Sequence, residues 1–244
     1  MTDPTSPALK FTPLRRMIDE VEMNAEPATR VRSAKDKIRT LGLVPIVELV
    51  HVDQGSDLID ALSEGGLPVA EITLRTSAGE IALEQLVSRH PHALLGAGTV
   101  RTLAQARRMV DIGVSFVVSP GTNEEIINYC VQHDVLVLPG VCTPTEVMRA
   151  LDAGAQWLKI FPAEVLGGVR YLQALAGPFS DVNLVPSGGI NSLNLSTYLQ
   201  VPQVMACGGS WMVASELLAS RRFDRITELT LEARAIVDAV RDVN

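Results

Sequence analysis

Short runs of aliphatic and β-branched residues alternate along the chain with stretches in which apolar residues recur at helical spacing. Each apolar run, together with the stretch that follows it, spans roughly 20 to 26 residues, which suits a strand, a helix and two short loops. Eight such units predict an α/β fold, a closed (β/α)8 TIM barrel; an open doubly wound sheet is the competing architecture but usually has fewer strands. The expected strands begin near Val44, Pro68, Ala93, Val114, Val135, Gln156, Val182 and Val204, and the helical stretches include 79–89, 103–112 and 145–153.

The two ends of the chain lie outside this repeat. Residues 1–27 are polar and carry four prolines, which predicts a loose extension with a short helix at about 14–24. A second helix is expected over 28–41, stopped by Gly42, and a final amphipathic helix over 224–242. These expectations divide the chain into an N-terminal helical extension (1–42), a barrel (43–220) and a C-terminal helix packed on the barrel (221–244).

Composition limits the classes of partner. The chain has 244 residues, of which 47% are hydrophobic, and this fits one large barrel domain. A formal net charge of -7 argues against nucleic acid or an anionic membrane as the main partner, although a local basic pocket can still bind an anionic substrate. No apolar segment is long enough to span a bilayer. Three cysteines without metal-ligand spacing, and no signal pattern, predict a cytoplasmic protein. We expect neither a metal nor a cofactor.

A lysine stands near the end of one apolar run, in Leu158-Lys159-Ile160-Phe161. An ammonium group is costly to bury, and burial favours the neutral amine, which can attack a carbonyl carbon. Another run places Glu71 and Arg75 on one face by strand alternation. If both faces point into a barrel, Lys159 and Glu71 meet at the carboxyl ends of the strands, where barrel active sites lie. These residues predict a metal-free Schiff-base lyase; a purely structural buried Lys–Glu pair is the alternative.

Two glycine turns follow the last two expected strands. They are Ser187-Gly188-Gly189 and Gly208-Gly209-Ser210. Glycine lets the backbone approach a ligand closely, and free N–H groups attract an anion. Since barrels commonly hold phosphate after strands 7 and 8, the pair of turns predicts a phosphate site, whereas one such turn alone would be an ordinary tight turn.

Other strand ends offer further candidates. Small residues around Thr99, and in 119–122 and 139–144, leave room for a substrate, and Thr99 adds a hydroxyl; Thr122 and Thr143 are also candidate helix N-caps. Glu48 and His51, near the end of the first strand, are candidates for the pocket. His90, His92 and His133 fall in loops that lead into strands, at the end opposite the expected site, so a metal cluster is not expected there.

The motifs resemble those of the bacterial 2-keto-3-deoxy-6-phosphogluconate (KDPG) aldolases, which also cleave 4-hydroxy-2-oxoglutarate (KHG). The resemblance covers about 43–218 in order. It implies a (β/α)8 class I aldolase that is homotrimeric and uses no metal. It also implies roles for individual residues: Lys159 as the Schiff-base lysine, Glu71 as general acid/base, Arg75, Thr99 and Phe161 around the pyruvate moiety, Pro120 in the pocket wall, and Ser187, Gly188, Gly189 and Ser210 at the phosphate. The matching segments are 71–76, 96–100, 119–121, 159–164, 176–179, 186–190 and 208–211.

Two features depart from the family pattern. The N-terminal extension is longer than the family usually carries, and Glu48 puts a charge where an apolar residue is usual. Members that act on the galactonate epimer have an arginine near the position of His51, and its absence weakens that alternative. A phosphosugar isomerase or epimerase, and a non-catalytic phospholigand-binding barrel, are the other hypotheses. The presence of both Lys159 and Glu71 argues against them.

Overall fold

The computed structural model describes residues 30–241. Eight parallel strands pair in the order β7-β6-β5-β4-β3-β2-β1-β8, and bridges from Leu184 to Val204 and from Ser187 to Gly208 join β7 to the β8 segment, so the sheet closes into the expected barrel. The strands are β1 (Leu43–Val47), β2 (Val69–Thr73), β3 (Leu94–Gly98), β4 (Phe116–Ser119), β5 (Leu136–Val141), β6 (Trp157–Ile160), β7 (Asn183–Pro186) and β8 (Cys207–Gly209).

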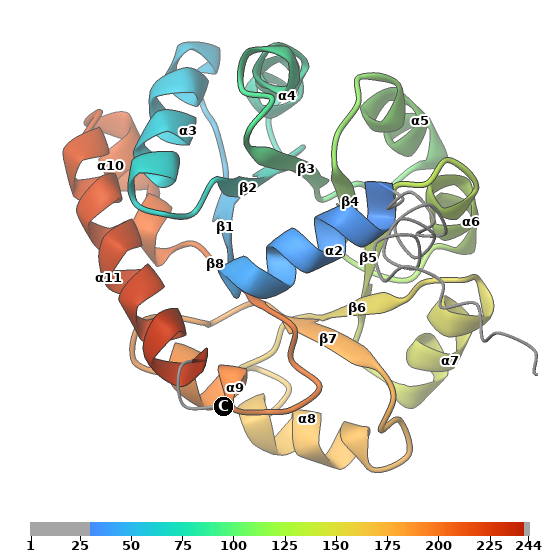
Figure 1. Ribbon diagram of the computed structural model, residues 1–244. Helices are drawn as coiled ribbons and strands as arrows, with labels where there is room; N and C mark the ends of the chain where they lie inside the picture. The colour runs from blue at the N-terminus through green and yellow to red at the C-terminus, as the bar shows by residue number, and fades with distance from the viewer. Residues whose placement is uncertain (1–29, 242–244) are drawn as a thin grey trace, which may run out of the picture.

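Helices alternate with the strands and form the outer ring of the barrel (Figure 1). The helix expected at 14–24 falls outside the described residues. Within 30–241 no helix is long and apolar enough to cross a membrane. The helices are α2 (Arg30–Leu41), α3 (Gly55–Glu64), α4 (Ser77–Arg89), α5 (Leu103–Asp111), α6 (Glu124–Gln132), α7 (Pro144–Asp152), α8 (Gly168–Ala176), α9 (Leu195–Leu199), α10 (Ser215–Ala219) and α11 (Phe223–Arg241), with short 3-10 turns η1 (Val52–Gln54) and η2 (Trp211–Val213).

Polar caps determine where several helices begin after a strand. The Thr76 hydroxyl accepts a hydrogen bond from the N–H of Gly79, and Thr102 and Gln105 form a reciprocal capping box. Thr143 caps α7, as its sequence position predicts. The expectation for Thr122 is wrong: Asn123 caps α6, while the Thr122 hydroxyl donates to the carbonyl oxygen of Gly140.

The last strand begins later than expected. Val204 makes only an isolated bridge to Leu184 of β7, and the β8 ladder starts at Cys207, which pairs with Leu43 of β1. The segment is therefore shared between two neighbours: its first residues pair with β7 and its last with β1. This arrangement closes the barrel and brings the segment's glycines level with Ser187.

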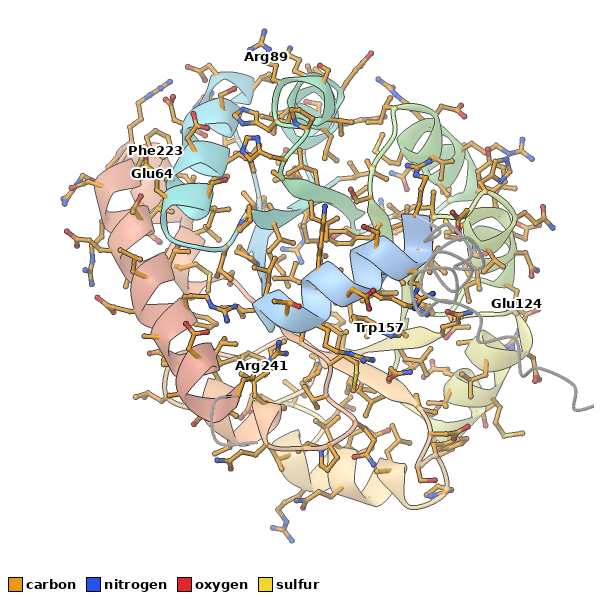
Figure 2. All side chains as sticks on the ribbon, viewed as in Figure 1. Glu64, Arg89, Glu124, Trp157, Phe223 and Arg241 are labelled. Atoms are coloured by element: carbon orange, nitrogen blue, oxygen red, sulfur yellow. The ribbon has the colours of Figure 1, made fainter. Side chains whose placement is uncertain are left out.

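Helix α2 lies across the barrel opening at the amino ends of the strands (Figure 1). Its Ile38 is fully buried and extends into the barrel interior, where it lines a small void with Phe116 and Leu138. On the outside, α11 packs against α3 and α9. Arg241, near the end of α11 (Figure 2), donates a 2.9 Å hydrogen bond to the carbonyl oxygen of Met205. Helix α2 thus covers the barrel at the amino ends of the strands, and the carboxyl ends are left for a site.

Candidate active site

Lys159 and Glu71 meet inside the barrel. Their strands, β6 and β2, are four places apart in an eight-stranded barrel, so inward-facing side chains reach across the interior. The Lys159 Nζ lies 3.2 Å from Glu71 Oε1, and the two residues are only 8% and 4% exposed. Lys159 Nζ also lies 5.4 Å from the centre of the Phe161 ring. A buried amine paired with one carboxylate has the components for covalent chemistry and proton transfer on a carbonyl compound.

Glycines make room for this pair. Gly96 and Gly98 stand beside Glu71 and Thr73 in the β2–β3 ladder. A side chain at Gly96 would collide with the ring of Phe116, and a Cβ at Gly98 would lie 2.4 Å from Glu71 Oε1. Only glycine at position 98 therefore leaves the space that the Glu71 carboxylate occupies.

Replacement of Gly98 by alanine should displace the Glu71 carboxylate while leaving the barrel folded. Because a displacement of about 1 Å can cost about 10²-fold in rate, kcat should fall by roughly that factor. Steady-state kinetics and thermal unfolding of the same preparation separate the two effects. Gly121→Ala is the matched control, since a Cβ there has no neighbour within 4 Å. A Gly98→Ala variant with normal kcat would show that this contact does not position Glu71.

A cavity of about 490 Å³ opens above the pair at the carboxyl ends of the strands. Its walls include Arg75, Phe161 and the two glycine turns, and Ser187 and Gly208 also line the small void that reaches Lys159 and Glu71. The volume is in the range of small-molecule sites. Ser187 and Gly208 thus lie between the cavity and the buried pair and contribute to the lining of both.

Glu48 lies in the wall of this cavity and pairs with Arg75. The Glu48 Oε2 is 3.1 Å from the Arg75 Nη1, and both side chains are about half exposed, at 47% and 52%. Ion pairs this exposed contribute only about 0.2–1 kcal/mol to stability. The pair therefore acts mainly through local charge: Glu48 offsets part of the positive potential that Arg75 presents to an anion.

The two glycine turns lie side by side and present free amides. Gly188 and Gly189 have φ of 93° and 87°, values that favour glycine. Within residues 30–241 the N–H groups of Gly188, Gly189 and Ser210 donate no hydrogen bond. The Ser187–Gly208 bridge holds the turns together at one end of the cavity. Converging free amides of this kind form a concavity suited to an anion such as phosphate.

The loop after β6 fixes one of these turns. Ala163 N–H donates to the carbonyl oxygen of Ser187 at 2.8 Å, and Glu164 N–H to that of Gly188 at 3.1 Å. The Tyr198 hydroxyl in turn donates to the Glu164 carboxylate at 2.5 Å, and burial raises the pKa of Tyr198. These contacts hold the Gly188 and Gly189 amides in place without using them as donors.

Other expected site residues lie at the margin. Thr99 is half-buried at the end of β3 in a left-handed backbone conformation (φ 58°), an unusual state for threonine, and Pro120 is exposed at the end of β4. Neither lines the 490 Å³ cavity, and neither does His51. Conversely, Ser215 and Glu216 of α10 line the cavity although they were not expected to. Their sequence carries no local signal, because only the turn after β8 brings them there.

Comparison with known proteins agrees with this geometry. The family model "KDPG and KHG aldolase" matches residues 34–229. A 2-dehydro-3-deoxy-phosphogluconate aldolase of Treponema pallidum is 40% identical over 202 residues, 83% of this chain and 96% of that protein.

Two solved structures are also similar. One is the KDPG aldolase of Legionella pneumophila, with pyruvate captured as a covalent carbinolamine intermediate. Its match to this chain has a TM-score of 0.78 at 36% identity and covers 81% of this chain and 96% of the Legionella chain. The aldolase of Zymomonas mobilis with 3-phosphoglycerate has a TM-score of 0.77 at 33% identity, covering 84% and 97%. With a family model that spans most of the barrel and relatives aligned over nearly their whole length, this chain belongs to the KDPG and KHG aldolase family.

Proposed function

We propose that this protein is a metal-independent class I aldolase that cleaves KDPG to pyruvate and glyceraldehyde 3-phosphate. The observation that carries the proposal is the buried Lys159–Glu71 pair, 3.2 Å apart, beneath a cavity whose far end presents free amides. The pair supplies a nucleophilic amine and a proton carrier, and the amides supply an anion site at a distance from them. Captured pyruvate in the Legionella relative and bound 3-phosphoglycerate in the Zymomonas relative support the same two-part substrate.

The reaction follows from these groups. The neutral Lys159 amine attacks the C2 ketone, and Glu71 transfers the protons that convert the carbinolamine to a protonated imine with loss of water. The imine then accepts the electron pair of the C3–C4 bond while Glu71, directly or through water, removes the proton of the C4 hydroxyl. Glyceraldehyde 3-phosphate leaves, the enamine is protonated at C3, and water hydrolyses the imine to release pyruvate and Lys159.

The remaining site residues bind the substrate in this proposal. Arg75 and Thr99 bind the keto acid end, with Phe161 against it and Pro120 in the outer wall. The phosphate is held by Ser187, Gly188, Gly189 and Ser210. KHG, which would give pyruvate and glyoxylate, has no phosphate, so it uses the residues at the keto acid end and not the phosphate site. The galactonate epimer of KDPG differs only in the configuration of the chain between the two ends, so it is the alternative substrate.

Trapping the imine tests the proposal directly. The protein is incubated with pyruvate and sodium borohydride, digested, and mapped by mass spectrometry. A pyruvyl adduct on Lys159 is the expected result. Unmodified Lys159 in a protein that binds pyruvate by an independent measurement would overturn the aldolase proposal and favour an isomerase, an epimerase or a non-catalytic phospholigand-binding barrel.

Glu48→Gln tests the electrostatic role of the Glu48–Arg75 pair. Removing a carboxylate 3.1 Å from Arg75 raises the positive potential of a cavity that receives an anionic substrate. The KM for KDPG should therefore fall by about 2- to 5-fold, with kcat little changed, and the gain should shrink at high ionic strength. Initial rates at low and high salt measure both effects. A rise in KM would instead indicate that Glu48 binds a substrate hydroxyl group.

The assembly and location of the protein are part of the same proposal. Family resemblance supports a homotrimer, and the cysteine usage supports a cytoplasmic location. Its partner is a small keto acid phosphate. Sedimentation of the full chain tests the trimer independently of catalysis.

A further inference from the structure

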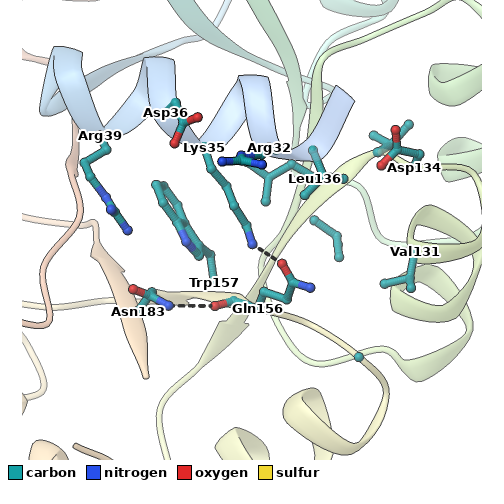
Figure 3. A pocket seen from close by; sticks show the side chains of 14 residues that line it. Arg32, Lys35, Asp36, Arg39, Val131, Asp134, Leu136, Gln156, Trp157 and Asn183 are labelled. Atoms are coloured by element: carbon teal, nitrogen blue, oxygen red, sulfur yellow. Dashed lines mark hydrogen bonds between the residues drawn. The ribbon is translucent and has the colours of Figure 1, made fainter. Parts of the chain in front are cut away.

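We propose that a second cavity, at the amino ends of β5, β6 and β7, binds a small anionic metabolite through phosphate or carboxylate oxygens. The cavity measures about 510 Å³ and lies between α2 and the first residues of these strands, Leu136, Trp157 and Asn183 (Figure 3). Lys159 and Glu71 are not part of its lining. It is therefore a site separate from the one at the carboxyl ends of the strands.

Basic side chains of α2 converge on this cavity. Lys35 and Arg39 point from the helix toward the strand starts (Figure 3). Within residues 30–241 the guanidinium of Arg39 makes no salt bridge or hydrogen bond. Burial lowers the pKa of Lys35, and the neighbouring charge of Arg39 lowers it further. The two cations therefore repel each other across a space that an anion could fill.

The carboxylates of the lining do not pair with these two cations. Within residues 30–241 neither Asp36 nor Asp134 forms a salt bridge with Lys35 or Arg39. Asp134 is already engaged, since its Oδ2 accepts a 2.8 Å hydrogen bond from the backbone N–H of Arg30.

Two amide side chains complete the polar part of the site. The side-chain oxygen of Gln156 accepts a hydrogen bond from Lys35 Nζ, and Asn183 Nδ2 donates to the backbone carbonyl oxygen of Gln156 at 3.4 Å (Figure 3). Val31 and Val131 give the cavity an apolar edge. Cationic and amide groups that converge in a cavity of this volume are typical of sites for small organic anions.

The cavity has a physical connection to the reactive pair. Helix α2, which carries Lys35 and Arg39, also carries Ile38, and Ile38 lines the same small void as Lys159 and Glu71. Strand β6 makes a second link, because Trp157 lies in the cavity wall and Lys159 follows it on the same face. A ligand that binds α2 thus acts on elements that support the active site from below.

The two tryptophans of the chain permit a test of each site separately. Trp157 lines the proposed anion cavity and Trp211 lines the active-site cavity. The full-length protein is labelled with 5-fluorotryptophan, its two ¹⁹F resonances are assigned with Trp157→Phe and Trp211→Phe, and phosphate or citrate is titrated at constant ionic strength. We expect a saturable shift of the Trp157 resonance, and comparison of the two anions shows whether phosphate or carboxylate is preferred.

Charge variants on α2 decide the outcome. The double variant Lys35→Gln/Arg39→Gln should raise the apparent Kd of the anion, measured from the Trp157 resonance, by at least about 10-fold. The reason is that it removes two charge-assisted hydrogen-bond donors. Lys37→Gln removes the same kind of charge from an exposed position of α2 outside the cavity. It should change the apparent Kd of the anion by less than about 2-fold.

Three results of the anion titrations would overturn the proposal, and a fourth result would come from variants of the N-terminal segment. They are the absence of a saturable response, a response equal to that of chloride, and equal weakening in the double variant and in Lys37→Gln. A Trp157 resonance that is insensitive to both anions but shifts when Asp19, Glu20 and Glu22 are replaced by amides would also overturn it. That result would assign the cavity to the chain's own N-terminal segment.

Discussion

Lys159→Ala should reduce the rate of pyruvate formation from KDPG by at least about 10⁴-fold, because the covalent route cannot begin without the amine. The borohydride-dependent pyruvyl adduct should disappear with it. Steady-state assays and intact-protein mass spectrometry measure the two effects. A variant that retains near-normal turnover would exclude the Schiff-base mechanism.

The burial of the pair calls for a second variant. Removing one partner of a buried ion pair can cost about 3–5 kcal/mol of stability, so Lys159→Ala could lose activity through unfolding. Lys159→Arg keeps the positive charge beside Glu71 but provides no amine that can be deprotonated. It should remain folded by thermal unfolding and be as inactive as Lys159→Ala. Lys37→Ala, on the exposed surface of α2, should be fully active.

Glu71→Gln should lower kcat by about 10²- to 10⁴-fold, the usual contribution of a positioned general acid/base. Glutamine keeps the size of the side chain and can still accept a hydrogen bond from Lys159, but it cannot carry a proton between steps. Pyruvate should therefore still be trapped on Lys159 by borohydride, only more slowly. The measurements are kcat and the single-turnover rate of trapping.

The control for Glu71→Gln is another carboxylate of the same site. Glu48→Gln removes a negative charge from the cavity wall without touching Lys159, so kcat should remain within about 2-fold. Similar losses of kcat in both variants would mean that total cavity charge, and not proton transfer by Glu71, limits the reaction.

The barrel was predictable because its sequence repeats one physical pattern eight times. Buried parallel strands require apolar runs, and each run is separated from the next by enough residues for one helix. The meeting of Lys159 and Glu71 followed from strand alternation only after the barrel had been assumed, since 88 positions separate them in the chain. The two glycine turns were identifiable for a similar reason: a closed barrel brings the loops after its last two strands together.

Side-chain partners were less accessible to sequence reasoning. The contact between Glu48 and Arg75 depends on the register of β1 against β2, and nothing in either segment specifies it. The N-cap of α6 is Asn123, one residue after the predicted Thr122. Both side chains can accept hydrogen bonds from the first turn of a helix, and the loop geometry selects Asn123. The cavity beneath α2 was not anticipated, because α2 is joined to the strand starts of β5–β7 only through the closed fold.

The position of Ile38 bears on the order in which the products leave the proposed active site. This fully buried side chain lines the void at Lys159 from the amino ends of the strands, so the large cavity through which a substrate can reach the lysine lies at the carboxyl ends. In the proposed reaction the departing aldehyde lies between the lysine adduct and the mouth of that cavity. The water that hydrolyses the adduct must follow the aldehyde's exit route in reverse. In the proposed reaction the phosphorylated fragment therefore leaves first, and pyruvate, which stays bound to Lys159 until water hydrolyses the imine, leaves last.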